Sequence, residues 1–315
     1  MSELSTNLRA DFALVVPAYN EAPVIPELVR ELRAAFERHR LEGEVLLVDD
    51  GSTDGTADLA LAEGAEWPAL RVLRHRRNRG KTEAMVTAAR ATERSVLIVF
   101  DADLQHSPDE IPRFLDRLAE GWDIVCGRKV GAYDKQAVSS VYNRLSRQLF
   151  DVPASDLNSM KAFRTEILRE IPLRHDWHRF FVVLAHDRGF SVSEIEIELH
   201  PRRAGTSKYT GLWRVVVGMM DLLSVWFLLV FSRKPLLLFG TAGAGLAGLG
   251  LLIGLVALYL RFVHELGFRP ILTLVLLLVT VGVTLVGFGL LAEMVAQLRQ
   301  EVDELRDRRR TRTPT

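Results

Sequence analysis

Apolar runs and amphipathic segments alternate along the first 127 residues of the chain. Five short apolar runs have the length and the β-branched content of strands buried in a sheet: residues 12–17, 45–48, 70–73, 96–99 and 124–126. Residues 26–40 place Leu28, Leu32 and Phe36 at helical spacing among charged residues, which predicts an amphipathic helix. Strands that alternate with helices predict an open, mainly parallel α/β sheet with helices on its faces.

Residues 191–200 show a different pattern, in which every second residue is apolar. Ile195, Ile197 and Leu199 alternate with glutamates, which predicts a half-exposed strand with its carboxylates toward solvent. A basic loop follows at residues 202–209, just before the long apolar segments of the chain.

Long apolar segments replace the short ones after residue 210. Residues 212–231 mix apolar side chains with Arg214, Asp221 and two tryptophans, which favours a helix lying along a membrane interface. Residues 235–260 and 270–291 are each longer than twenty residues and carry no charge, so each can cross the hydrocarbon core. We therefore predict an interfacial helix followed by a two-helix transmembrane hairpin.

Charged residues around the hairpin predict its orientation. The turn at residues 261–269 is short, so both flanks of the hairpin must lie on one side of the membrane. Those flanks carry Arg233, Lys234 and six arginines of the tail, whereas the turn carries two arginines. By the positive-inside rule both flanks are cytoplasmic, and we expect a multi-pass protein of the inner (plasma) membrane.

Small and apolar residues within the predicted spans indicate helix contacts. Gly250 and Gly254 stand four residues apart in the first span, with Gly243 and Gly245 nearby, which allows close approach of helices. A short coiled-coil seam follows the second span, formed by Leu291, Val295, Leu298, Val302 and Leu305. Two heptads are marginal alone, so this seam supports a homo-oligomer only if the spans already associate.

The composition agrees with one large domain followed by a membrane region. In 315 residues, 40 Lys and Arg balance 40 Asp and Glu, so no net charge favours nucleic acid as a partner. The single cysteine, Cys126, excludes an intramolecular disulfide, and the polar first twelve residues lack the apolar segment of a secretory signal. We therefore expect an N-terminal cytoplasmic domain. The full division is residues 1–209 for that domain, 210–234 for the interfacial helix, 235–292 for the two spans and 293–315 for a basic cytoplasmic tail.

The strongest candidate chemistry follows the apolar run at residues 96–99. Asp101 and Asp103 come one residue apart where a parallel strand ends, and alternation along an extended chain would point both to one side. A hard divalent metal that holds a diphosphate would balance their charges, because Mg²⁺ commonly uses one or two carboxylates plus substrate phosphates. The alternative is that these two aspartates simply face solvent at the end of the strand, which is common for an isolated Asp-x-Asp sequence.

Two further strand ends carry polar groups. Asp49 and Asp50 end the second strand, with Ser52 or Thr53 as the expected cap of the next helix. After the third strand, Gly80-Lys81-Thr82 lacks the glycine that a nucleotide triphosphatase loop needs five positions earlier, where His75 stands, so that loop is excluded. The basic residues there either meet phosphate at the next helix N-terminus or form a solvated face. Ser107 is the expected cap of a further helix.

Several of these segments resemble the motifs of family 2 glycosyltransferases of the GT-A (Rossmann-like) fold: residues 16–21, 48–52, 78–81 and 101–105. Further segments resemble the polyprenyl-phosphate glycosyltransferases, such as dolichol-phosphate mannosyltransferase: residues 158–164, 178–180 and 202–209. The Gln-x-x-Arg-Trp motif of processive polysaccharide synthases does not occur. The resemblance implies an inverting hexosyltransferase that uses Mg²⁺ or Mn²⁺ and moves a sugar from a UDP-glucose-type or GDP-mannose-type donor to undecaprenyl or dolichyl phosphate.

The resemblance also implies roles for individual residues. Asp50 would contact the nucleotide base or ribose, Asp101 and Asp103 would hold the diphosphate and the metal, and Gln105 would complete the metal shell. The remaining expected donor-site residues are Pro17, Tyr19, Asn20, Glu21 and Lys81. The expected residues for the acceptor phosphate are Arg128, Lys135, Ser139, Arg202, Ser207 and Lys208.

Phosphate chemistry supports part of this assignment. Arginine binds phosphate oxygens bidentately and lysine acts as a point charge, so Arg128, Arg202 and Lys208 can stabilise charge during transfer, with Asp103 and Asp156 as the other catalytic candidates. A phosphomonoester-like acceptor is largely a dianion at neutral pH, so Asp156 either orients it or caps the turn after Pro153. The alternatives are transfer to another lipid such as diacylglycerol, or a non-catalytic membrane scaffold that binds nucleotide sugars.

Overall fold

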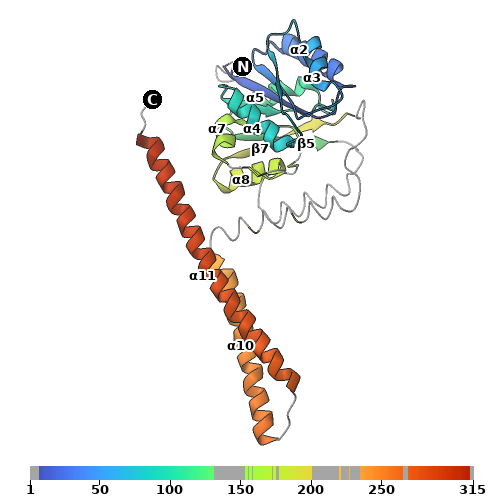
Figure 1. Ribbon diagram of the computed structural model, residues 1–315. Helices are drawn as coiled ribbons and strands as arrows, with labels where there is room; N and C mark the ends of the chain where they lie inside the picture. Colours follow the sequence, from blue (N-terminus) through green and yellow to red (C-terminus); the bar gives the residue numbers. More distant parts are fainter. Residues whose placement is uncertain are drawn as a thin grey trace. The chain divides into compact units, whose positions relative to one another are not determined.

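The computed structural model of the chain contains two compact units, residues 1–214 and residues 215–315. It describes residues 7–130, 153–200 except 155, 158, 172, 175 and 176, single residues 220 and 227, and residues 235–264 and 269–312. Both units are drawn in Figure 1.

Seven strands of the first unit form one sheet in the order β3-β2-β1-β4-β6-β5-β7. The strands are β1 (Phe12–Ala18), β2 (Glu44–Asp49), β3 (Leu70–Arg74), β4 (Val96–Val99), β5 (Ile124–Val130), β6 (Lys161–Arg164) and β7 (Val192–Glu198). Strand β6 runs antiparallel to its neighbours β4 and β5, and the other pairs are parallel. The mainly parallel α/β sheet expected from the apolar runs is therefore confirmed.

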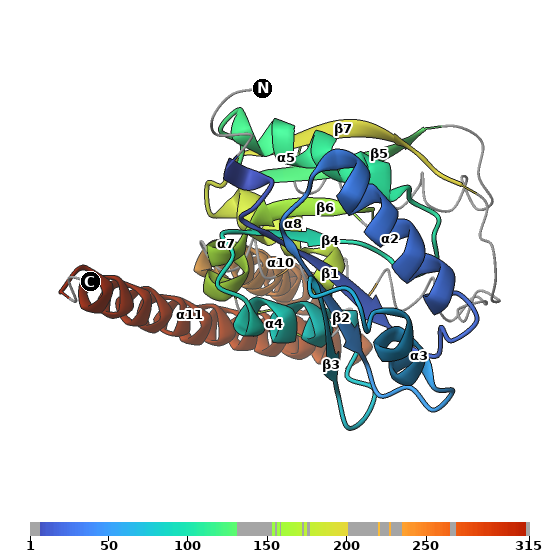
Figure 2. The same ribbon diagram turned by 90° about the horizontal axis from the view of Figure 1, so that it is seen from above.

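Helices cover both faces of this sheet, as Figure 2 shows from above. The helices are α2 (Ile25–His39), α3 (Thr56–Glu63), α4 (Lys81–Ala91), α5 (Ile111–Ala119), α7 (Thr165–Glu170) and α8 (Phe181–Asp187), with 3-10 turns η1 (Pro108–Glu110) and η2 (Trp177–Arg179). Leu28 and Leu32 of α2 and Phe114 of α5 join a single apolar core with inward residues of the strands. On β6, the ring of Phe163 packs against that of Phe181 of α8, with centroids 4.5 Å apart and planes tilted by 51°. Its neighbour Ala162 faces the α2 and α5 core.

The strand missing from the sequence prediction is β6. It is four residues long and inserts antiparallel between β4 and β5, so Lys161 pairs with Val99 on one side and Cys126 on the other. So short a segment has too few residues for a period-2 pattern to be recognised. Strand β5 is also longer than expected, because pairing with β7 extends it to Val130.

Two local expectations at strand ends are wrong, and one is confirmed. Strand β4 ends at Val99, and Leu104 has a left-handed φ of 54°, so Asp101 and Asp103 lie in a turn where strand alternation does not apply. Helix α3 begins at Thr56 after Gly55, with neither Ser52 nor Thr53 as its cap. The side chain of Ser107 accepts a hydrogen bond from the Asp109 N–H and caps η1 as expected.

The second unit contains two long helices, α10 (Pro235–Val263) and α11 (Arg269–Arg312). Residues 235–263 and 270–298 are long and apolar enough to cross a membrane, by length and composition. Helix α11 continues without a break past residue 291, where the sequence predicted that the second span ends. The carboxylate of Glu293 accepts a hydrogen bond from the Leu236 N–H at the start of α10, over 3.2 Å. The interfacial helix predicted at residues 210–234 lies outside the described residues, except 220 and 227.

Small residues set the close packing of α10 against α11. A Cβ added to Gly243 would lie 2.5 Å from the Gly282 carbonyl oxygen, and one added to Gly250 would lie 2.9 Å from Leu278 Cβ. A Cβ on Gly245 would meet no atom within 4 Å. A Cβ on Gly254 would lie 3.2 Å from Val275 Cγ1. The glycine contact predicted from the sequence is therefore made by Gly243, Gly250 and Gly254, while Gly245 lies outside it.

Candidate active site

The loops after β1 and β2 are bound to each other at the carboxyl edge of the sheet. The Asn20 N–H donates to Ser52 Oγ over 2.9 Å, and the Thr53 N–H donates back to Asn20 Oδ1 over 2.9 Å. The Glu21 N–H donates to Thr56 Oγ1 over the same distance. Of the expected donor-site residues, Pro17 lies within β1 and Tyr19 is 36% exposed. Asn20 and Glu21 make the hydrogen bonds that join the two loops. This edge is where open α/β sheets bind ligands.

An ion pair joins the first residue of α4 to the turn after β4. Nζ of Lys81 donates to Oδ1 of Asp101, and the two side chains are 23% and 33% exposed. Burial raises the pKa of the Asp101 carboxyl, but the Lys81 ammonium outweighs burial and the net pKa lies well below the usual range. Asp101 is therefore ionised, and a cation already stands beside it.

Asp103 and Gln105 lie in the same turn as Asp101. Oδ1 of Asp103 accepts a hydrogen bond from the Gln105 N–H over 3.2 Å, and the Gln105 carbonyl accepts from the His200 N–H over 2.8 Å. Within the described part of the chain, no three His, Cys, Asp or Glu side chains form a complete metal cage. Two carboxylates and an amide, all oxygen donors, suit Mg²⁺ or Mn²⁺ only if a substrate diphosphate supplies further ligands. These residues fit a metal that binds together with the donor.

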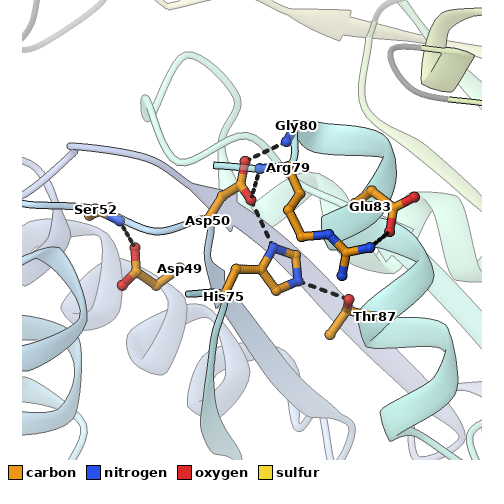
Figure 3. A network of polar contacts seen from close by, with 8 residues as sticks. All are labelled: Asp49, Asp50, Ser52, His75, Arg79, Gly80, Glu83 and Thr87. Carbon is orange, nitrogen blue, oxygen red and sulfur yellow. Dashed lines mark hydrogen bonds and ion pairs between the residues drawn. The ribbon is translucent and has the colours of Figure 1, made fainter. Parts of the chain in front are cut away.

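Asp50 is the most enclosed of those expected site residues that the structure describes. Its side chain is 6% exposed and accepts three hydrogen bonds, from the Arg79 N–H, the Gly80 N–H and the imidazole of His75 (Figure 3). The neighbouring Asp49 accepts a bond from the Ser52 N–H over 3.0 Å. The Arg79 and Gly80 N–H groups, which precede α4, are therefore already bound to Asp50.

Arg128 and Asp156 each have a partner within the protein. Arg128 on β5 pairs with Glu196, which lies directly opposite it on β7, and both side chains are about half exposed. Oδ2 of Asp156 lies 3.3 Å from Nζ of Lys129, with both side chains largely buried. The other residues expected to bind the acceptor phosphate lie outside the described residues: Lys135, Ser139, Arg202, Ser207 and Lys208.

Three polar residues beneath this edge received no role from the sequence. Lys161 is 3% exposed, its Nζ donates to the Leu157 carbonyl over 2.8 Å, and burial lowers its pKa to about 8. His178 N–H donates to Thr82 Oγ1 over 3.0 Å, and burial lowers the pKa of the imidazole well below its usual value. His106 is 3% exposed, and no hydrogen-bond partner for its Nδ1 occurs among the described residues. Membership of the motif segments at 158–164 and 178–180 was the only sequence signal for Lys161 and His178, and His106 follows directly after the segment at 101–105.

Comparison with known proteins gives consistent matches. The model of "Glycosyl transferase family 2" matches residues 13–183. The dodecaprenyl-phosphate galacturonate synthase of Rhizobium johnstonii is 32% identical over 273 residues, which cover 83% of this chain and 80% of that protein. The undecaprenyl-phosphate 4-deoxy-4-formamido-L-arabinose transferase of Pseudomonas fluorescens is 32% identical over 257 residues, covering 80% of this chain and 74% of that protein.

A solved structure supports the fold. The glucosyl-3-phosphoglycerate synthase of Mycobacterium tuberculosis, in complex with Mn²⁺, UDP and phosphoglyceric acid, superimposes with a TM-score of 0.58 at 18% identity. The match covers 73% of this chain and 83% of that one. At this identity the likeness establishes a common fold.

Proposed function

This chain belongs to glycosyl transferase family 2, and we propose that it transfers one sugar from a nucleotide-diphosphate sugar to a polyprenyl phosphate at the cytoplasmic face of the inner membrane. The observation that carries the proposal is the group formed by Lys81, Asp101 and Asp103, at the edge where the loops after β1 and β2 meet. The polyprenyl-phosphate substrates in the names of the similar proteins, together with two helices long enough to span a membrane, support the acceptor.

The donor half of the proposal rests on charge. Cleavage of a sugar–diphosphate bond leaves negative charge on the departing nucleotide, and nearby cations lower the energy of that transition state. Lys81 supplies one fixed positive charge beside Asp101. Asp101, Asp103 and Gln105 would hold a divalent metal, which when bound supplies further positive charge to the diphosphate.

The acceptor half rests on the nucleophile. An acceptor phosphate oxygen forms a bond to the anomeric carbon while the bond from that carbon to the donor diphosphate breaks, and the nucleoside diphosphate leaves with the bonding electrons. One such displacement inverts the anomeric configuration. Because a phosphomonoester is largely a dianion near pH 7, no strong base is needed. We assign to Asp156, which pairs with Lys129, an orienting role in this step.

The remaining expected roles stand as proposals of the same kind. Pro17, Tyr19, Asn20 and Glu21 would line the donor nucleotide, and Arg128 would exchange Glu196 for an acceptor phosphate oxygen. Lys135, Ser139, Arg202, Ser207 and Lys208 would bind the acceptor phosphate near the membrane surface.

Mass spectrometry of lipid products tests the proposal. Membranes that contain the full chain are incubated with short-chain polyprenyl phosphate, Mg²⁺ or Mn²⁺, and a panel of UDP- and GDP-sugars. We expect one donor to yield a polyprenyl monophosphate sugar, and we expect Asp103→Ala to lower that rate by about a hundredfold or more, the typical loss when a group that stabilises transition-state charge is removed.

The control lipid in the same assay is diacylglycerol, which offers no phosphate. Glycosylated diacylglycerol without polyprenyl product would overturn the acceptor assignment. Tight nucleotide binding without any lipid product would favour a non-catalytic scaffold. A full rate without any divalent metal would remove the metal from the proposal.

A further inference from the structure

Asp50 binds the turn before α4 with both of its carboxylate oxygens. Its Oδ1 accepts from the Arg79 N–H over 2.8 Å and its Oδ2 accepts from the Gly80 N–H over 2.7 Å. The residue is 4% exposed, and Figure 3 shows its carboxylate directed at the turn before α4. The carboxylate thus binds two main-chain N–H groups that no helix hydrogen bond uses, as an anion at a helix N-terminus does.

His75 connects this carboxylate to helix α4. Its Nδ1 lies 2.8 Å from Asp50 Oδ1 and its Nε2 lies 2.9 Å from Thr87 Oγ1, so both ring nitrogens have partners (Figure 3). The side chain is 6% exposed. The main-chain N–H of His75 also donates to the Asp49 carbonyl over 2.9 Å. The ring and the main chain of His75 are therefore both hydrogen-bonded, and the ring fixes the direction of the Asp50 carboxylate.

Gly51 holds the same turn from its other side. A Cβ at position 51 would lie 2.5 Å from the main-chain carbon of Arg77 and 2.7 Å from the Asn78 nitrogen, and Gly51 has a φ of 76°. Only glycine allows both this conformation and this approach without strain. The turn at residues 77–80 is therefore clamped between Gly51 and Asp50.

We propose that His75 and Asp50 are positioning residues of the donor site, which hold the turn at residues 77–80 so that Lys81 stands beside Asp101. Lys81 follows directly after Gly80, the last residue that Asp50 binds. Movement of the turn would therefore move the Lys81 ammonium away from Asp101. The proposal rests on the donor half of the proposed function, and it gives Asp50 an indirect role through the turn.

Acylation of lysines, followed by mass spectrometry of the full chain, tests the geometry without any ligand. Pairing with Asp101 shields the Lys81 amine, so we expect His75→Ala to increase its labelling several-fold. His75→Asn keeps an amide donor near the position of Nδ1 and should restore most of the protection. Thr87→Val removes only the hydroxyl that contacts His75 Nε2, so it should cause a smaller increase in Lys81 labelling. This variant replaces His75→Ala in the experiment if His75→Ala does not fold.

Two matched controls accompany this experiment. Lys129 is about as buried as Lys81, with a side chain 18% exposed, and is paired with Asp156 rather than with Asp101, so its labelling should not change. Arg79→Gln removes a charge from the same turn but keeps the main-chain N–H that Asp50 binds, so Lys81 should stay protected. Unchanged Lys81 labelling in His75→Ala would overturn the proposal. Equal increases at Lys81 and Lys129 would do the same, because they would indicate general loosening.

Calorimetry with UDP and GDP, each with Mn²⁺, provides the functional readout. We expect His75→Ala to weaken diphosphate binding about tenfold, the value of a lost charge-assisted contact, with partial recovery in His75→Asn. Unchanged diphosphate affinity in a folded His75→Ala variant would reduce the network to a structural role. If the wild type binds neither UDP nor GDP, the donor half of the proposed function fails. The labelling experiment then still shows whether His75 and Asp50 hold Lys81 beside Asp101.

Discussion

The carboxylates of Asp50 and Asp101 at the sheet edge differ in exposure and in their partners, because different segments of the chain surround them. Asp50 is buried and hydrogen-bonded within the protein, whereas Asp101 is partly exposed and paired with the Lys81 ammonium. Both residues follow an apolar strand, and the sequence around them is similar. Of these two carboxylates, only Asp101 retains a surface that a ligand or a metal can reach.

The surroundings of Lys161 likewise determine the pKa of its ammonium group. It lies on β6 between β4 and β5, and its ammonium has one described hydrogen bond, to the Leu157 carbonyl. Burial lowers the pKa of Lys161 from 10.5 to about 8, with Asp156 and Asp101 acting in the opposite direction. The folded protein therefore binds this proton less tightly than the unfolded chain.

Stability should consequently rise with pH through the alkaline range. Below pH 8 both states carry the Lys161 proton and the full cost of burying the charge is present. Between pH 8 and 10.5 the unfolded chain binds more protons, so the free energy of unfolding rises by roughly 3 kcal/mol. In thermal melts of the detergent-solubilised chain, the wild type should gain roughly 6 to 12 °C relative to Lys161→Met across this range. Parallel curves for the two proteins would contradict the assignment.

At the scale of secondary-structure elements, pairing across the sheet and contact between the two long helices decide the architecture. The antiparallel strand β6 begins at the buried Lys161 and brings this residue beneath the carboxyl edge. In the second unit, α10 and α11 approach closely where Gly243 meets Gly282. In lipid, helices gain no hydrophobic stabilisation from each other, so such close contacts supply much of their association.

Gly243→Leu should separate the two helices at this end of the hairpin. A side chain at position 243 would meet the main chain of Gly282, whereas one at position 245 would enter open space. Spin labels on the exposed positions Leu238 and Leu290, measured by electron paramagnetic resonance, should move apart in Gly243→Leu and keep their distance in Gly245→Leu. An unchanged distance in both variants would mean that the glycine contact does not hold the hairpin.

At the scale of the whole molecule, the expected orientation in the membrane can be tested with single cysteines. The native Cys126 gives little background, because burial raises the pKa of its thiol to about 12. We expect an impermeant maleimide to label His264→Cys, directly after α10, on intact cells. Glu93→Cys, in the first unit, should react only after the membrane is permeabilised. Labelling of both sites on intact cells would contradict a cytoplasmic domain.

Local features of the sequence were sufficient for much of this protein. Runs such as residues 45–48 and 96–99 show buried strands, and residues 235–260 show a possible span, because length and periodicity are properties of adjacent residues. The aspartates that directly follow apolar runs likewise indicated the carboxyl edge of the sheet, because they are adjacent to the strands in the sequence. The family followed from the order of these motifs.

Only the tertiary structure decided which of these residues meet. It bound Asp50 to a turn near residue 80, buried Lys161 between β4 and β5, and selected Gly243 over Gly245 for the helix contact. It also ended β4 before Asp101 and placed that carboxylate against Lys81. Each of these outcomes depends on contacts between segments distant in the chain, whose charge and burial no local pattern specifies.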